Sequence, residues 1–170
     1  MSTPHSDAGG LTDQILAFQV HDEDYGINIR QIREIRGWSN VRAVPGAADF
    51  VLGILRLRGA IIPIVDLRRR LGLGDSVCDE RTVIVIVGIG VDDGLHNVGL
   101  VVDSVSDVMD LGGGKVLDSP ELGTPAQKSL VRRVALIDER MYLLIELERI
   151  FGRRELAALE QIVEPGPEPG

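Results

Sequence analysis

Two stretches of the sequence imitate loops that bind a phosphate group or calcium. Residues 88–94 (GIGVDDG) follow an apolar segment, as a dinucleotide-binding loop does, but the third glycine comes one position late. No helix is predicted to follow and present amide groups to a pyrophosphate, so this run predicts a hairpin turn. Asp22, Asp24 and Gly26 imitate the start of a calcium loop, but the glycine comes too early and the closing glutamate is missing. We expect a solvated turn there.

The residue types that most often perform catalysis or bind metals are scattered along the chain. His5, His21 and His96 fall in the predicted tail and turns, without the spacing of metal ligands. Cys78 is followed by two carboxylates, which raise the pKa of a thiol and weaken it as a nucleophile. The sequence shows no arrangement typical of a serine–histidine–aspartate triad. We therefore expect no enzymatic activity, no metal and no cofactor.

The charged residues that stand out lie at the ends of apolar segments. Glu34 and Arg36 follow one such segment, and Arg58 precedes Gly59 at a predicted tight turn. A guanidinium beside a glycine turn can make a bidentate pair with a carboxylate, within the chain or on a partner. The pattern leaves both alternatives open.

The composition restricts the class of partner. The chain has 170 residues and a formal net charge of −8, which disfavours unspecific binding to nucleic acid and to anionic lipid. No apolar run approaches the roughly 20 residues of a membrane span, and residues 1–10 lack the pattern of a secretion signal. A single cysteine favours a reducing compartment. We expect a soluble cytoplasmic protein that binds no nucleic acid and does not insert into a membrane.

Hydrophobic patterns predict a mainly β protein. Alternating apolar residues predict strands near 15–20 and 25–30, joined by an acidic turn. Ile29, Ile32 and Ile35 are spaced by three and predict a short helical turn. Many short strands with little helix favour small closed barrels, because closure removes exposed strand edges.

The same patterns extend over the rest of the chain. Further strands are predicted at 50–57, 60–67, 83–87, 98–108, 134–137 and 141–147. Pro63 lacks an amide hydrogen, so its strand should lie at a sheet edge or carry a bulge there. The last two strands should form a hairpin around residues 138–140, and helical spacing predicts a short helix over 153–163.

Three segments, taken in order, resemble the CheW family of chemotaxis coupling proteins. They are residues 25–37 (YGINIRQIREIRG), 53–68 (GILRLRGAIIPIVDLR) and 98–108 (VGLVVDSVSDV). The resemblance covers about residues 14 to 152. Arg56 stands where the family usually has asparagine, which adds a charge beside the expected contact surface and bears on the choice of receptor rather than on the fold.

The resemblance implies two five-stranded SH3-like β-barrels packed side by side, with a hydrophobic groove between them. They would form one CheW-like domain over 14–152, with the change of barrel near 68–82 and C-terminal strands that return to the first barrel. A disordered arm over 1–13, the helix over 153–163 and a tail over 164–170 would flank it.

The resemblance also implies a non-enzymatic adaptor in bacterial chemotaxis arrays. Its partners would be the cytoplasmic hairpin tip of a methyl-accepting chemoreceptor and the regulatory domain of the histidine kinase CheA, and the cytoplasmic protein would be recruited to receptors at the membrane. The positions that match receptor-binding positions of the family are Glu34, Gly53, Arg58, Val83, Gly99, Val105 and Val108. Ile29 matches a kinase contact, and Leu122 a second kinase or ring contact.

Other functions stay open at this point. A small-molecule-binding β-barrel would need polar groups that converge in a cavity. A CheW-like scaffold could also serve a chemosensory pathway other than motility. The related domains of CheV and CheA are accompanied by receiver, ATP-binding or phosphotransfer segments, for which we expect no room in 170 residues. Each of the three valines could equally serve core packing.

Overall fold

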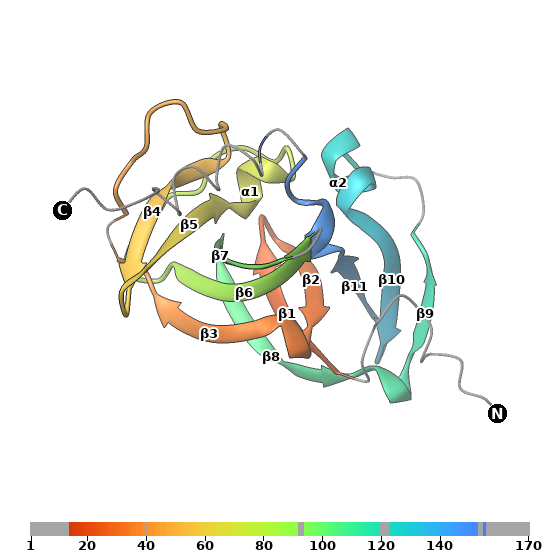
Figure 1. Ribbon diagram of the computed structural model, residues 1–170. Coiled ribbons are helices and arrows are strands. Elements are labelled where there is room, and N and C mark those ends of the chain that lie inside the picture. The colour runs from red at the N-terminus through yellow and green to blue at the C-terminus, as the bar shows by residue number, and fades with distance from the viewer. Residues whose placement is uncertain (1–13, 40, 92–93, 120–122, 153–154, 156–170) are drawn as a thin grey trace.

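The computed structural model describes residues 14–39, 41–91, 94–119, 123–152 and 155. The described chain forms two β-sheets with few helices, which confirms the predicted fold class (Figure 1). The sequence-based predictions for the N-terminal arm, the C-terminal helix and tail, and Leu122 lie outside the described residues, apart from the single residue Glu155. Within the described residues, no helix has the length and apolar character needed to cross a membrane.

The two sheets contain six and five strands in the described chain, where the resemblance implied five and five. The six-stranded sheet consists, in spatial order, of β8 (Ser104–Asp110), β1 (Gln14–Val20), β2 (Glu23–Asn28), β11 (Arg140–Ile145), β10 (Val131–Ile137) and β9 (Lys115–Asp118). The five-stranded sheet consists of β3 (Ile32–Gly37), β6 (Val83–Val91), β7 (Gly94–Val102), β5 (Ala60–Asp66) and β4 (Val51–Leu57). The helical elements whose bounds lie within the described residues are α1 (Leu67–Arg70), α2 (Pro125–Leu130) and the 3-10 turns Ile29–Gln31, Leu111–Gly113 and Leu147–Arg149. In the hairpin formed by β10 and β11, β11 thus pairs with β2 from the start of the chain, and β10 pairs with β9.

Three hydrophobic clusters follow from the alternation of side chains along the strands. In β1, Leu16 and Phe18 belong to a large cluster that both sheets contribute to, here called the shared core. Ile15 and Ala17 point the other way, into a cluster formed by the six-stranded sheet and its turns. The five-stranded sheet has an equivalent cluster of its own, here called its inner cluster, which includes Ile64 and Ile84. Each sheet therefore has buried side chains on both of its faces.

The five-stranded sheet curls until its two edges meet. β3 and β4 are its edge strands, yet the segment after β3 pairs with β4 through Arg42 and Ile54, whose amides and carbonyls exchange hydrogen bonds of 2.9 and 2.8 Å. Glu34 of β3 also reaches Arg58, which follows β4. One backbone bridge and one ion pair thus join the two edges of the sheet.

The predicted helical turn over Ile29, Ile32 and Ile35 is only partly correct. A single 3-10 turn spans Ile29–Gln31, capped by the Asn28 side chain, which accepts a hydrogen bond from the Arg30 amide. Ile32 and Ile35 lie in β3, which pairs with β6. Pairing with β6, which is distant in the sequence, determines the structure of residues 32–37, although the isoleucines are spaced as in a helix. The local spacing alone does not reveal this pairing.

The prediction that Pro63 lies in an edge strand is wrong, because β5 lies between β7 and β4. Pro63 is opposite Ile54, whose own backbone groups bond to Arg42 and not to β5. The Pro63 nitrogen therefore faces β7, where pairing begins only at Ile64. The predicted bulge does not lie at Pro63 either, because the register of the β4–β5 pair shifts between Val51 and Gly53 of β4. The missing amide hydrogen removes no ladder bond.

The single strand predicted over 98–108 is two strands in different sheets, β7 and β8. Asp103 lies between them, and its amide donates to the carbonyl of Gln19 in the other sheet. Its carboxylate accepts from Arg68 at 2.6 Å and from the His21 amide at 2.9 Å. These bonds hold the chain at the point where the apolar run crosses from one sheet to the other.

The predicted hairpin turns are confirmed by backbone geometry. Asp138 and Glu139 join β10 to β11 with φ values of 50° and 67°, and His21 and Asp22 join β1 to β2 with values of 53° and 66°. Two successive residues with positive φ match the twist of antiparallel strands. The acidic calcium-like stretch is therefore a turn, as expected.

A substitution at Gly53 tests the closure of the five-stranded sheet. A Cβ atom at this position would overlap the carbonyl oxygen of Arg42. We expect Gly53→Ala to lower the free energy of unfolding by about 2 kcal/mol, as overpacking does in a tightly packed site. Gly37→Ala is the control, since a Cβ there meets nothing within 4 Å, and it should change stability by less than about 0.5 kcal/mol. Urea unfolding of both variants checks this, and equal stabilities would contradict the close approach.

Candidate partner-binding surfaces

Glu34, Arg36 and Arg58 form a charged cluster at one end of the five-stranded sheet. Arg58 donates from Nη1 to Glu34 Oε1 at 2.9 Å, and Arg36 lies 3.6 Å from the other carboxylate oxygen. Glu34 is opposite Ile86 in the β3–β6 ladder, so it shares the face of the inner cluster. The structure thus shows a partner within the chain for Arg58, one of the two alternatives that the sequence left open.

The geometry of Arg58 leaves most of its donors exposed. Its φ of 52° and the φ of 82° at Gly59 form the tight turn between β4 and β5. The side chain of Arg58 is 75% exposed, whereas that of Glu34 is 26% exposed. Because a guanidinium carries five N–H donors and one is used here, the others can bind a carboxylate from outside.

Three predicted receptor-contact valines lie on the face that both sheets turn toward the shared core. Val83 and Val105 pack against that core and are partly exposed, and Val108 is 43% exposed. Val105 and Val108 lie opposite Phe18 and Leu16, both buried residues of the shared core. These valines therefore extend the shared core to its solvent-exposed border.

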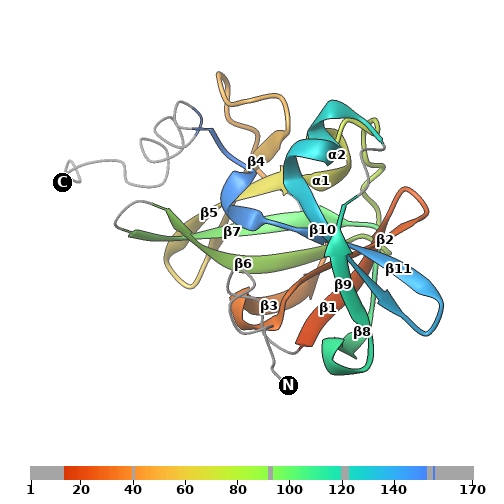
Figure 2. The same cartoon turned by 90° about the vertical axis from the view of Figure 1, so that its right-hand side faces the viewer.

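Ile35 belongs to the same apolar border, and sequence reasoning missed it. It is opposite Val85 of the shared core and is 46% exposed on the edge strand β3. Figures 1 and 2 both place β3 and β8 along the lower side of the molecule. Four partly exposed side chains beside the shared core are here together called the apolar border: Ile35, Val83, Val105 and Val108. If residues 32–37 had been predicted as a strand and not as a helical turn, the alternation along that strand would have indicated Ile35 as a surface residue.

Gly53 and Gly99 are buried, unlike the other predicted receptor-contact residues. A Cβ atom on Gly99 would come within 2.6 Å of Ile64 Cδ1 and 3.0 Å of Ile84 Cγ2, both in the inner cluster. Their position gives both glycines a role in packing. A substitution at either would act on a partner through the fold of the sheet.

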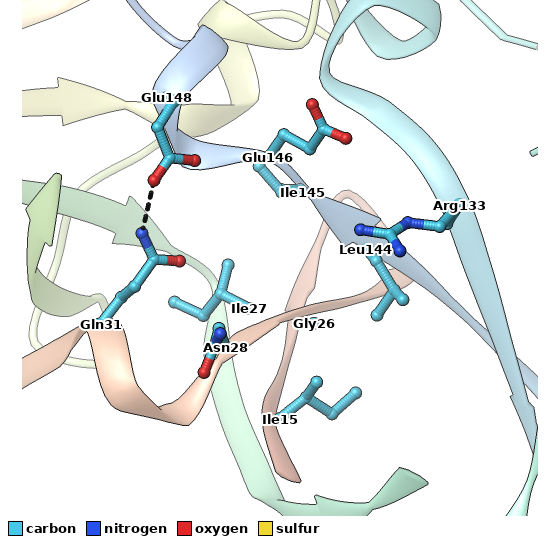
Figure 3. Close-up of a pocket in the computed structure, with 10 residues that line it drawn as sticks. All are labelled: Ile15, Gly26, Ile27, Asn28, Gln31, Arg133, Leu144, Ile145, Glu146 and Glu148. Atoms are coloured by element: carbon cyan, nitrogen blue, oxygen red, sulfur yellow. Dashed lines mark hydrogen bonds between the residues drawn. The ribbon is translucent and has the colours of Figure 1, made fainter. Parts of the chain in front are cut away.

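Ile29 lies in the 3-10 turn before β3 and packs against the shared core, where it is partly exposed. Beside this turn is a cavity of about 280 Å³, which Figure 3 shows. Its lining comes from β1, β2, the 3-10 turn, β10, β11 and the chain after β11: Ile15, Gly26, Ile27, Asn28, Gln31, Arg133, Leu144, Ile145, Glu146 and Glu148. None of the predicted site residues is among them. No sequence pattern indicated this cavity, because its lining residues come together only when the sheet forms.

The buried side chains of Asp66, Tyr25 and Gln127 make hydrogen bonds within the protein. Asp66 is fully buried, and it accepts from the Ser76 hydroxyl at 2.5 Å and the Ser76 amide at 3.0 Å. Tyr25 donates to Glu23 and accepts from Gln127, and burial raises its pKa. These bonds fix loops and α2 against the sheets, so the groups have a structural role.

Cys78 and the acidic residues do not form a reactive centre. Burial raises the pKa of the Cys78 thiol, and the carboxylates of Asp66 and Asp79 raise it further. This direction agrees with the expectation from the sequence, and a thiol with a raised pKa is a weak nucleophile at neutral pH. Across the described ranges, no group of three or more histidine, cysteine, aspartate or glutamate residues is placed to hold a metal ion.

Comparisons with known proteins place this geometry in a family. The CheW-like domain matches residues 14–155. A probable chemotaxis protein CheW of Rhizobium etli is 36% identical over 145 residues, which cover 85% of this chain and 91% of that protein. The chemotaxis protein CheW of Klebsiella aerogenes is 32% identical over 151 residues, 89% of each chain.

A solved structure supports the same conclusion. The crystal structure of the scaffolding protein TtCheW from Thermoanaerobacter tengcongensis superposes with a TM-score of 0.72 at 28% identity, over 85% of this chain and 96% of that one. These are names of chemotaxis and scaffolding proteins and not of enzymes, in agreement with the sequence-based prediction. The fold, the matched residues and the relatives together show that the chain belongs to the CheW-like family.

Proposed function

We propose that this chain is a non-enzymatic adaptor that couples the cytoplasmic tips of chemoreceptors to the histidine kinase CheA, in arrays beneath the membrane. The observation that carries the proposal is Arg58, whose guanidinium is held by Glu34 while most of it stays exposed. A fixed turn and an ion pair restrict the side chain before a partner arrives, which lowers the entropy lost on binding. A carboxylate on the receptor tip is the complementary group.

The apolar border supports the same partner. A receptor tip is a helical hairpin, and an amphipathic helix can place its apolar stripe along exposed aliphatic side chains. Ile35 and Val108 are the most exposed of the four, and they would supply the desolvated contact area. Arg58 and Glu34 would set the register by charge complementarity.

The kinase contact lies in the 3-10 turn that precedes β3, whereas Glu34 lies within β3. Ile29 packs toward the shared core, whereas the Glu34 side chain shares the opposite face with the inner cluster. An adaptor needs separate surfaces for two partners that it holds at once. We assign Ile29 to the regulatory domain of CheA, and Leu122, outside the described residues, to a second contact with the kinase or ring.

Binding to both partners is the direct test. The purified full chain is mixed with purified CheA and with a receptor signalling fragment, and complexes are recovered by pull-down. We expect the chain to bind each partner alone and both together. If a chain shown to be folded by circular dichroism binds neither partner, the adaptor function is wrong.

Removal of Arg58 should separate binding from stability. The ion pair is exposed on the Arg58 side, and such pairs contribute about 0 to 1 kcal/mol to stability. We therefore expect Arg58→Ala to leave thermal unfolding nearly unchanged and to weaken receptor binding about tenfold or more, since a contact at the interface is lost. Titration of the receptor fragment by calorimetry measures the affinity.

Arg140→Ala is the matched control for Arg58→Ala. Arg140 makes a similar exposed ion pair with Asp24 at 2.8 Å, on the six-stranded sheet. Its removal should change neither stability nor receptor binding. If Arg58→Ala unfolds the protein, or if both variants lose receptor binding equally, Arg58 has no specific receptor contact.

A charge at Ile29 should act on the kinase alone. Ile29→Asp places a carboxylate on the partly exposed turn, and we expect kinase affinity to fall about tenfold because a buried contact would lose its apolar partner. Receptor binding should be retained. Ile29→Val, which keeps the apolar surface, should bind the kinase as the original chain does. Loss of both partners together, with a lowered unfolding temperature, would instead show that Ile29 serves the shared core.

A further inference from the structure

The cavity beside the 3-10 turn has an apolar floor and a charged rim. Figure 3 shows the side chains of Ile15, Ile27 and Leu144 around its lower and inner part, with Glu146 and Glu148 above them. An aliphatic chain that enters the cavity would lie against these apolar side chains. Its polar end would then reach the two carboxylates.

The charges of the rim leave one carboxylate unused. Glu148 accepts a hydrogen bond from Gln31 Nε2 at 3.1 Å, which is a neutral partner. Arg133 on the opposite wall already makes an interaction within the protein. The Glu146 side chain has no hydrogen bond or ion pair with the described part of the chain, and it is partly buried. A cation that binds here gains an ionic partner and breaks no existing bond.

The size of the cavity restricts its occupant. Sites for small molecules of drug size have volumes of about 300 to 1,000 Å³. This cavity, at about 280 Å³, lies just below that range and is open to solvent. One long side chain with an aliphatic stem and a charged end fits both the volume and the pattern of floor and rim. Lysine and arginine have that form.

We propose that the cavity binds a lysine or arginine side chain of the kinase regulatory domain, with its stem on Ile27 and Leu144 and its charge between Glu146 and Glu148. This inference rests on the proposed adaptor function. The choice of the kinase follows from position, because Asn28 and Gln31, which line the cavity, flank the turn that carries Ile29. A kinase surface seated on Ile29 is therefore next to the opening.

The test compares Glu146→Gln and Glu146→Lys with the original chain in titrations with the purified kinase. We expect Glu146→Gln to weaken kinase binding roughly fivefold, as the loss of one partly exposed ion pair does. Glu146→Lys should weaken it more, by roughly tenfold or above, because it adds repulsion. Receptor affinity and unfolding temperature should stay unchanged, since the Glu146 amide still donates to the Leu130 carbonyl.

Glu139→Gln is the control, because it makes the same charge change at the other end of the β10–β11 hairpin. It should leave kinase affinity unchanged. Raising the salt concentration should lower the kinase affinity of the original chain more than that of Glu146→Gln. Salt screens the ion pair of Glu146, and the variant lacks this ion pair. Equal affinities of the original and Glu146→Gln for the kinase, or a loss confined to the receptor, overturn the inference. Failure of the original chain to bind the kinase at all instead contradicts the proposed function.

Discussion

The shared core between the two sheets is the constraint on which the rest of the structure depends. Strands of both sheets direct alternate side chains into it, among them Phe18, Val85 and Leu100, and each fully buried side chain of this size contributes about 1.5 to 3 kcal/mol. At the border of this cluster, Ile35 on β3 and Val108 on β8 lie opposite buried residues of the shared core and are themselves partly exposed. The fold itself therefore creates the apolar border that we assign to a receptor.

The two partner surfaces follow from this arrangement. The curling of the five-stranded sheet brings Glu34 and Arg58 together from opposite edges, so the charged cluster exists only when the sheet has closed. In the six-stranded sheet, β11 of the C-terminal hairpin pairs with β2. This pairing brings together the residues that line the cavity next to Ile29. Both surfaces are formed within the folded chain, in agreement with the proposed role of an adaptor.

The sequence predicted those features that depend on local chemistry. The hairpin turns at His21-Asp22 and Asp138-Glu139 and the strands around them follow from turn residues and alternation. The sequence did not predict the features that depend on distant pairing. Residues 32–37 form a strand because β6 pairs with them, and Gly53 is buried because Arg42 approaches it. The exposure of Ile35 and the cavity depend on the same long-range contacts, so no local pattern could indicate them.

Methyl NMR of the isotopically labelled chain, titrated separately with a receptor signalling fragment and with the kinase regulatory domain, tests the assignment of two surfaces most directly. The account predicts that the receptor fragment shifts the methyl signals of Ile35, Val105 and Val108, and that the kinase domain shifts those of Ile29, Ile27 and Leu144. The account would be contradicted if both partners shifted the same methyl signals. It would also be contradicted if the receptor fragment shifted only methyl groups of the six-stranded sheet that lie far from β8.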